Sequence, residues 1–487
     1  MIQGTASHVG KSLITAGLCR LLQRIGVRVA PFKPQNMSNN AAVTDDGGEI
    51  GRAQALQAYA SVISTSVHLN PVLLKPEPHH KCQIILQGRW WKTVSAQQFH
   101  HLKHQLMPKI LESYYYLQTK YQFIITEGAG SPAEINLRRN DIANMGFAEV
   151  VDIPVVLVVD VERGGSIANV FGTHGLLSPS ERQRIKGVII NKFRGDVHLF
   201  DGAIQIIQEK TTWPVLGVIP YFPLLQNLPA EDSLSMPSIK NQGKIRIAVP
   251  LLPYRSNMDD LDPLNAEDDV ELLTVKAGEA IPGNCHAVIL TGSKSTIADL
   301  EFLKQQGWDI DLKAHYRRGG YIIGLCGGFQ MLGNNLVDAT GLEGQQKQAL
   351  GLGYFDMTTT MNAQKIIRQQ RATELLDNMI VDGYEIHLGQ SIGPATSRPW
   401  LRFEDGQFDG AVTADNRVLG CYVHGLFMND QFRHAFLRRI LNNFSSSLNF
   451  SYKMDHILND WAEHLRANLN PKFIQSLLSL TKSVVPS

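Results

Sequence analysis

Short apolar runs rich in β-branched residues alternate with helix-compatible segments along most of the chain. In the first half these runs are VRVAPF, QIILQG, FIITEG, VVLVVD, KGVIINKF and VLGVIP. Each run is followed by a polar or glycine-containing turn and then by a segment that can form a helix. Parallel strands need such crossover helices, and strands covered on both faces are apolar throughout. The pattern therefore predicts an α/β fold built on a doubly wound, mostly parallel sheet.

The alternation breaks once and then resumes, which predicts two such domains. The break is the polar stretch SLSMPSIKNQGK, and the runs IRIAVPLL, ELLTVKA, AVILTG and YIIGLCGG follow it. Near the end, FRHAFLRRILNNF and ILNDWAEHLRANL have the apolar spacing of helices. A chain of 487 residues is also long for one domain. We predict domains at 1–232 and 245–440, a linker at 233–244 and a helical C-terminal tail at 441–487.

The composition limits the kinds of molecule that the protein can be expected to bind. The chain has 46 Lys and Arg against 45 Asp and Glu, so no overall basic field favours nucleic acid. Its five cysteines are far apart and form no Cys-x-x-Cys pair, which is typical of reduced thiols. No apolar run is long enough to span a bilayer. We therefore expect a cytoplasmic protein that binds neither nucleic acid nor membrane.

The opening stretch GTASHVGKS has the features of a phosphate-binding loop before a helix. Gly4, Thr5 and Gly10 would let backbone N–H groups approach phosphate oxygens, Lys11 would add a charge, and Ser12 could ligate magnesium. The strict pattern has its first glycine at the position of Thr5, whereas here it is Gly4. Only three residues precede Gly4, so the strand before the loop must be short. Alone, the loop leaves a plain glycine turn as the alternative.

Two acidic residues are candidates to complete a Mg²⁺ site with Ser12. Glu127 ends the strand FIITEG, where side chains face the crevice at the carboxyl edge of a parallel sheet. Asp46 lies in the loop VTDDGGEIG, where a simple turn residue is the alternative. Lys33, after another strand, and Asn191, in INKF, are candidates for ATP binding, although loop capping would equally explain Asn191.

A second constellation predicts thiol chemistry. Cys326 lies between glycines in GLCGG after a strand, which is the nucleophile-elbow arrangement with cysteine in place of serine. The N–H of Gly327, together with Gly292 or Ser293 in LTGSKST, could bind an oxyanion. His424, just after a strand in GCYVHGLF, is the candidate base. A small buried core residue is the alternative for Cys326.

The GTASHVGKS loop resembles that of the dethiobiotin synthetase group, in which the extra residue is normal and ATP phosphorylates a carboxylate or carbamate. The half containing Cys326 resembles the class I glutamine amidotransferases. Those enzymes usually carry a glutamate two residues after the histidine, where this chain has Leu426. A different third group is therefore implied, and Glu385 in GYEIHLG is a candidate. We interpret Cys421, which lacks the glycine elbow, as a core residue.

Several separated motifs together resemble the cobyric acid synthase family over nearly the whole chain. They are PFKPQNMSNNAAVTDDGGEIGRAQALQA, EGAGSPAEINL, NKFRGD, LTGSKSTIADL and GYEIHLG. The resemblance implies a P-loop ATPase-like domain followed by a glutamine amidotransferase domain. It also implies ATP and Mg²⁺ as cofactors, and adenosylcobyrinic acid a,c-diamide and L-glutamine as substrates. The b, d, e and g carboxylates would be amidated, and cobalt would arrive inside the substrate.

Two other functions stay open at this point. Cobyrinate a,c-diamide synthase has the same two activities on other carboxylates, and PFKPQNMSNN favours cobyric acid synthase over it. A partitioning-type P-loop ATPase with an inactive glutaminase domain is the second alternative. Such ATPases usually carry another lysine early in the loop, where this chain has Thr5 and Ala6.

Overall fold

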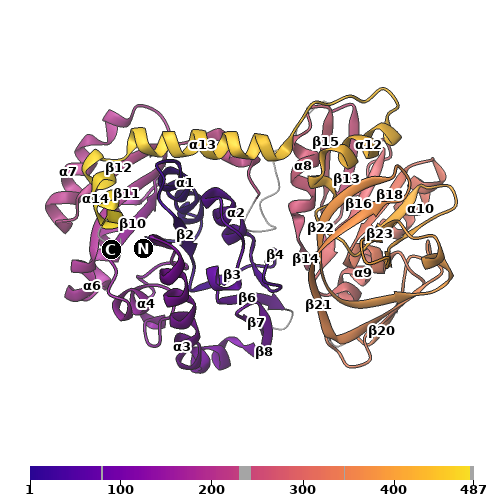
Figure 1. The fold of residues 1–487 in the computed structure, drawn as a ribbon, viewed down its shortest axis with the longest axis horizontal. Helices are drawn as coiled ribbons and strands as arrows, with labels where there is room; N and C mark the ends of the chain where they lie inside the picture. Colours follow the sequence, from indigo (N-terminus) through magenta and orange to yellow (C-terminus); the bar gives the residue numbers. More distant parts are fainter. Residues whose placement is uncertain (78–80, 230–242, 345, 483–487) are drawn as a thin grey trace.

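The computed structural model describes residues 1–77, 81–229, 243–344 and 346–482. Figure 1 shows two α/β units side by side, with helix α13 (Phe450–Asn468) running along one edge from the second unit to the first. The predicted fold class, including the helical tail, is confirmed. Residues 233–242 of the predicted linker lie outside the described residues, so the domain boundaries stay predictions.

A parallel sheet forms the centre of the first unit. One part has the order β1-β10-β11-β12, and β2 pairs with β9 in a second part. A parallel bridge between Ile2 and Glu127 places β9 beside β1. The strand before the phosphate loop is only three residues long, yet it is central. The strands are β1 (Ile2–Gly4), β2 (Val29–Phe32), β9 (Phe123–Thr126), β10 (Val155–Asp160), β11 (Ile185–Phe193) and β12 (Val215–Pro220).

Seven helices of this unit connect or flank its strands within the described residues. They are α1 (Lys11–Arg24), α2 (Arg52–Ser61), α3 (Ala96–Lys120), α4 (Met145–Val150), α5 (Ser166–Leu176), α6 (Pro179–Arg184) and α7 (Asp201–Thr211).

The run QIILQG does not belong to the parallel sheet, and its predicted place there was wrong. It lies in β7 (Lys81–Leu86), which pairs antiparallel with its neighbours β6 and β8. Only Gln87 and Gly88 separate β7 from β8, and both have positive φ (45° and 80°). Such a two-residue turn closes a hairpin and leaves no room for a crossover helix. The remaining strands of the first unit are β3 (Gln35–Met37), β4 (Ala41–Val43), β5 (Glu49–Gly51), β6 (Val72–Glu77) and β8 (Arg89–Ser95).

The second unit contains a six-stranded sheet in the order β15-β13-β16-β18-β26-β25, parallel except at β25. Its strands are β13 (Ile245–Pro250), β15 (Val270–Val275), β16 (Ala287–Leu290), β18 (Tyr321–Leu325), β25 (Ala411–Val412) and β26 (Val418–Cys421). Its helices are α8 (Asp262–Ala266), α9 (Thr296–Gln305), α10 (Trp308–Arg317), α11 (Gly327–Met331) and α12 (Asp430–Ile440).

A long hairpin, β21 (Thr358–Glu374) with β22 (Met379–Ile392), builds a second, largely antiparallel sheet that the sequence patterns did not predict. This hairpin faces the first unit (Figure 1). The remaining strands are β14 (Arg255–Ser256), β17 (Gly292–Ser293), β19 (Asn335–Val337), β20 (Gln348–Leu350), β23 (Leu401–Phe403) and β24 (Phe408–Asp409).

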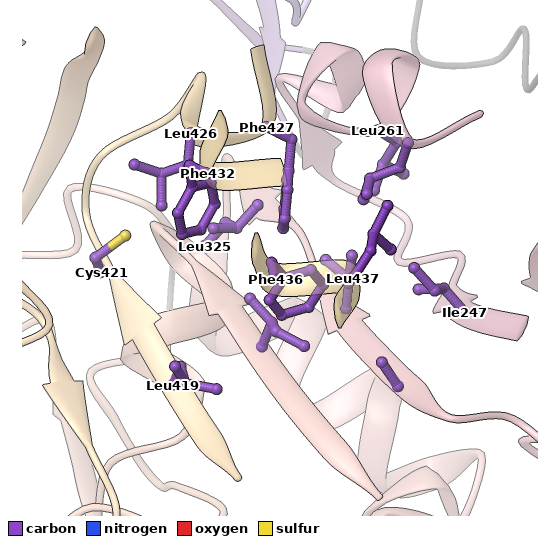
Figure 2. Packing of buried hydrophobic residues seen from close by; sticks show 14 of the residues in the cluster. Ile247, Leu261, Leu325, Leu419, Cys421, Leu426, Phe427, Phe432, Phe436 and Leu437 are labelled. Atoms are coloured by element: carbon purple, nitrogen blue, oxygen red, sulfur yellow. The ribbon is translucent and has the colours of Figure 1, made fainter. Parts of the chain in front are cut away.

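Helix α12 packs its apolar face on the parallel sheet of the second unit. Figure 2 shows Phe432 and Phe436 of the helix close to side chains from the strands, among them Leu419 and Cys421. Cys421 is fully buried, and burial raises the pKa of its thiol well above the usual range. This agrees with our interpretation of Cys421 as a core residue.

The C-terminal helices return to the first unit. The indole N–H of Trp461 in α13 donates to the carbonyl of Leu13 in the phosphate-loop helix at 2.7 Å, and Arg20 pairs with Asp455 at 2.8 Å. Helix α14 (Pro471–Lys482) follows. In the described part of the chain, every helix is too short or too polar to cross a membrane.

Candidate active sites

The phosphate loop connects β1 to α1 and is supported by the end of β11. Gly10 has φ of 99°, and a Cβ there would lie 2.2 Å from Nδ2 of Asn191. Glycine is therefore required at this position, both for the left-handed backbone and for the close contact. Nδ2 of Asn191 donates to the carbonyl of Val9 at 2.8 Å. Asn191 thus fixes the loop, whatever else it contacts when nucleotide is bound.

The ammonium group of Lys11 lies inside the loop that precedes it. It donates to the carbonyls of Ala6 (3.0 Å) and Gly130 (3.1 Å). A Cβ at Gly4 would come within 3.0 Å of the same ammonium group, so a side chain there would crowd the lysine. The glycine one position early in the pattern is thus the residue that leaves room for Lys11.

Glu127 is fully buried and gathers three side chains of the first unit. Its carboxylate accepts from Ser12 Oγ at 2.7 Å, from Lys33 Nζ at 2.8 Å and from Gln57 Nε2 at 2.7 Å. A buried carboxylate needs such partners. Ser12 and Glu127 also place two hard oxygens together beside the loop, which suits Mg²⁺ completed by phosphate oxygens and water. Sequence reasoning missed Gln57, which sits mid-helix in α2 without a motif of its own.

Asp46 does not join this group, and its expected place in the metal site is corrected. Its side chain is exposed in the loop between β4 and β5. The carboxylate accepts from Ser66 Oγ at 2.7 Å and from the N–H of Val67 at 3.2 Å. The residue therefore links two surface turns.

A cavity of about 770 Å³ opens beside the phosphate loop. Its lining combines polar groups with apolar side chains, among them Phe222, Leu225 and Trp461. Asp262, from the second unit, also lines it. The volume and mixed lining are those of a site for a sizeable ligand. Every predicted ATP-binding or metal residue lines it except Gly4, Thr5 and Asp46.

Cys326 sits in a strained turn between β18 and α11. Its φ and ψ are 52° and −106°, which a residue with a side chain rarely adopts. A Cβ at Gly328 would lie 2.1 Å from the carbonyl oxygen of Leu290, and one at Gly327 would lie 2.7 Å from the backbone nitrogen of Ser293. Glycines are thus needed at positions 327 and 328 for the turn to fit against Leu290 of β16 and against Ser293.

A small cavity lies beside the sulfur of Cys326, between the two units. Its lining includes Ser293 and Lys294, which follow β16 and carry one of the predicted oxyanion donors. Gly292 is not among the lining residues. A Cβ at Gly292 would lie 3.0 Å from the ring of His424, so this glycine makes room for the imidazole instead. Gln83 of the first unit closes the cavity from the other side.

His424 is held by a carboxylate that the sequence did not reveal. Nδ1 of His424 lies 2.6 Å from Oδ2 of Asp260, and both side chains are at most 2% exposed. Burial lowers the pKa of His424, but the Asp260 charge and the Cys326 thiol outweigh it and raise the pKa to about 10. Nε2 of His424 has no hydrogen-bonding partner among the described residues. Because the Cys326 thiol also acts on the pKa of this imidazole, the two groups are close enough for Nε2 to exchange a proton with the thiol.

Glu385 is not the third group, and that expectation was wrong. Its carboxylate accepts from Arg368 Nε at 2.5 Å and Gln370 Nε2 at 2.9 Å, and lies 3.2 Å from Nε2 of His387. Asp260 precedes His424 by 164 residues in an unremarkable turn, so no local motif indicates it.

Comparisons with known proteins match each half of the chain to a family model. Residues 1–235 match the family model of the CobQ/CobB/MinD/ParA nucleotide binding domain, and residues 246–432 match that of the CobB/CobQ-like glutamine amidotransferase domain. A cobyric acid synthase of Rhodobacter capsulatus is 50% identical over 98% of this chain and 99% of its own length. One from Brucella anthropi is 48% identical over 96% and 97%.

The chain belongs to the cobyric acid synthase family. Membership confirms the resemblance seen in the motifs, and it identifies a glutamine-dependent amidotransferase of cobalamin biosynthesis with a nucleotide-binding domain.

Proposed function

We propose that the enzyme converts adenosylcobyrinic acid a,c-diamide to adenosylcobyric acid by amidating the b, d, e and g carboxylates. Each amidation uses one ATP and one glutamine. The observation that carries the proposal is the cavity of about 770 Å³ next to Lys11, Ser12 and Glu127, since its polar and apolar lining suits both a nucleotide and an apolar macrocycle with carboxylates. Protein groups for binding cobalt are unnecessary, because the metal arrives in the corrinoid.

In the first unit, Lys11 and Lys33 supply positive charge for phosphate and carboxylate oxygens. Bound beside Ser12 and Glu127, Mg²⁺ would neutralise phosphate charge. The substrate carboxylate attacks the γ-phosphorus of ATP, ADP leaves, and an acyl phosphate forms. Ammonia then attacks the acyl carbon, phosphate leaves, and the nitrogen loses a proton.

In the second unit, the thiolate of Cys326 attacks the amide carbon of glutamine. The N–H groups of Gly327 and Ser293 are the proposed donors to the oxyanion. His424 gives its proton to the departing nitrogen, so ammonia leaves and a thioester remains. Water, deprotonated by His424, then releases glutamate. Asp260 holds the imidazole with Nδ1 protonated throughout both steps.

The other end of glutamine is a zwitterion, and the cavity beside Cys326 offers both charges. Lys294 lines it as a cation and Glu343 as an acid, and Lys365, which also lines it, is paired with Glu49 of the first unit at 2.6 Å. Burial raises the pKa of Glu343 to about 7, although the N–H and hydroxyl of Thr296 and the charge of Lys294 oppose this. An ammonium group close to Glu343 would favour its ionised form. We assign the α-ammonium of glutamine to Glu343 and the α-carboxylate to Lys294.

The test separates the two units with a single atom change. Cys326→Ser should abolish glutamine-dependent amidation, while ammonia at alkaline pH should still support it, because NH₃ is the nucleophile. Cys421→Ser is the matched control and should retain activity with both nitrogen sources. Corrinoid products are read by mass spectrometry and glutamate by an enzymatic assay. A Cys326→Ser enzyme that still uses glutamine would refute the assignment.

A further inference from the structure

One short turn of the second unit carries two adjacent buried aspartates with different partners. In the turn η5 (Met258–Leu261), Asp260 holds His424, as described above. Its neighbour Asp259 pairs instead with Arg52 of the first unit, with Arg52 Nη2 and Asp259 Oδ2 3.1 Å apart. The Asp259 side chain is 3% exposed, so this ion pair is largely shielded from water. A contact between the units thus lies one residue from the group that orients the catalytic histidine.

The start of the same turn is fixed to the first unit by a second contact. The N–H of Asn257 donates to Oδ1 of Asn40 at 3.0 Å, and Oδ1 of Asn257 accepts from the N–H of Ala41 at 3.2 Å. The carbonyl of Asn40 accepts in turn from the N–H of Arg52 at 3.2 Å. Asn257 has φ of 54°, so its backbone takes the left-handed conformation at this contact. The position of η5 therefore depends on the first unit.

Asp259 also reaches the histidine by a second route. The hydroxyl of Tyr384 donates to Oδ2 of Asp259 at 3.4 Å. The Tyr384 ring stacks on the ring of His424, with centroids 5.3 Å apart and an interplanar angle of 22°. Displacing Asp259 would consequently disturb both the carboxylate and the aromatic ring that hold His424.

At the other end, Arg52 is joined to the phosphate loop by one helix. It is the first residue of the ten-residue helix α2. Gln57 of the same helix donates to the backbone carbonyl of Ser12 at 3.1 Å and to Glu127 at 2.7 Å. These are the backbone and carboxylate that would meet Mg²⁺ and phosphate. A shift of the phosphate loop can therefore move α2 and, with it, Arg52.

We propose that Arg52 is a positioning residue for glutamine hydrolysis, acting through Asp259 to set the Asp260–His424 pair according to the state of the phosphate site. The inference rests on the proposed function, because it assumes that glutamine and ATP are used by the two units. This arrangement makes glutamine hydrolysis in the second unit depend on the phosphate site of the first unit, so that ammonia forms when an acyl phosphate is present to react with it.

The charge balance of the turn supports a positioning role for Arg52. Asp262 follows Asp260 by two residues, so three acidic groups lie in or directly after this turn. Arg52 opposes the effect of burial on the pKa of Asp259, which is raised overall. Without the guanidinium, Asp259 would be buried without a counter-ion, and repulsion from Asp260 would displace the turn.

The test uses Arg52→Met, which keeps the bulk and removes the charge, and Arg52→Lys, which restores the charge. For Arg52→Met, kcat of glutamine hydrolysis with ATP and corrinoid present should fall tenfold or more, since small misplacements of catalytic groups have effects of this size. KM for glutamine and the rate of ammonia-dependent amidation should stay within about twofold of wild type, and Arg52→Lys should recover part of kcat. The control Gln369→Ala removes an exposed contact to Asp45 of the first unit (2.7 Å) and should not change kcat.

A double-mutant cycle decides whether Arg52 acts through Asp259. Arg52→Met with Asp259→Asn should be no slower than the slower single variant. The increase in glutamine hydrolysis on adding ATP and corrinoid should also be lost in Arg52→Met. Unchanged kcat, additive losses in the double variant, or equal losses with glutamine and ammonia would each overturn the inference. Failure of ammonia-dependent amidation in the wild-type enzyme would instead contradict the proposed function.

Discussion

Replacing Asp260 by Asn tests the catalytic arrangement of the glutaminase unit most sharply. Asn keeps the shape of Asp260 but removes its charge, and its amide N–H can face Nδ1 of His424. The imidazole would then carry its proton on Nε2, and that nitrogen could no longer accept a proton from Cys326.

The structure gives the size of the effect. The pKa of His424 is raised from 6.5 to about 10, with Asp260 the largest of the groups that raise it. At about 1.4 kcal/mol per pH unit, the surroundings favour the imidazolium by about 5 kcal/mol. Losing most of this stabilisation in the transition state would lower kcat for glutamine hydrolysis by about 10³- to 10⁴-fold.

The assay is glutamate release, measured beside ammonia-dependent amidation by the same preparation. The amidation rate should stay near wild type, because the acyl phosphate forms in the other unit. Glu385→Gln is the matched control, since this carboxylate contacts His387 and not His424, and it should lower kcat by less than tenfold. Retention of a tenth or more of wild-type glutaminase activity by Asp260→Asn would refute the role given to Asp260.

Three further outcomes follow from the same structure. Glu127→Gln should raise the Mg²⁺ concentration needed for half-maximal amidation, or stop ATP use, whereas Asp46→Asn should leave that concentration unchanged. A Mg²⁺ titration of each variant measures this, and equal effects of the two substitutions would contradict a metal site that contains Glu127 and not Asp46. Lys294→Met should raise KM for glutamine about tenfold or more and leave ammonia-dependent amidation intact, in steady-state kinetics. Burial and the Asp259 charge raise the pKa of Asp262 to about 8. Between about pH 4 and about pH 8 this carboxyl is therefore protonated in the folded protein but ionised in the unfolded chain. The free energy of unfolding consequently falls as pH rises through this range. Asp262→Asn should therefore gain Tm over wild type at pH 8 relative to pH 5, and a constant difference would argue against this pKa.

Local patterns predicted the parts of the fold and sites that depend on neighbouring residues. The strand–loop–helix around Lys11 and the glycine elbow around Cys326 are each encoded within about ten residues, so both could be predicted from the sequence. The interpretation of QIILQG failed because an apolar run does not reveal whether its neighbours pair parallel or antiparallel. That information lay in the Gln87–Gly88 turn.

Groups brought together by tertiary structure were beyond such patterns. Asp260 and His424 meet across the second unit, and Gln57 reaches Glu127 from a different helix. A carboxylate in a short turn has no periodicity or spacing that indicates its partner. The prediction of Asp46 as a metal ligand failed because an acidic residue before two glycines is equally typical of a metal-binding loop and of a surface turn.

The most direct test of the central claim is mass spectrometry of the corrinoid after incubation with ATP, Mg²⁺ and glutamine labelled with ¹⁵N at the amide. The proposed function predicts four successive conversions of carboxylic acid to amide in adenosylcobyrinic acid a,c-diamide, each carrying one ¹⁵N. Products that stop at fewer labelled amides with excess substrates, or labelling of cobyrinic acid at its a and c positions instead, would contradict it.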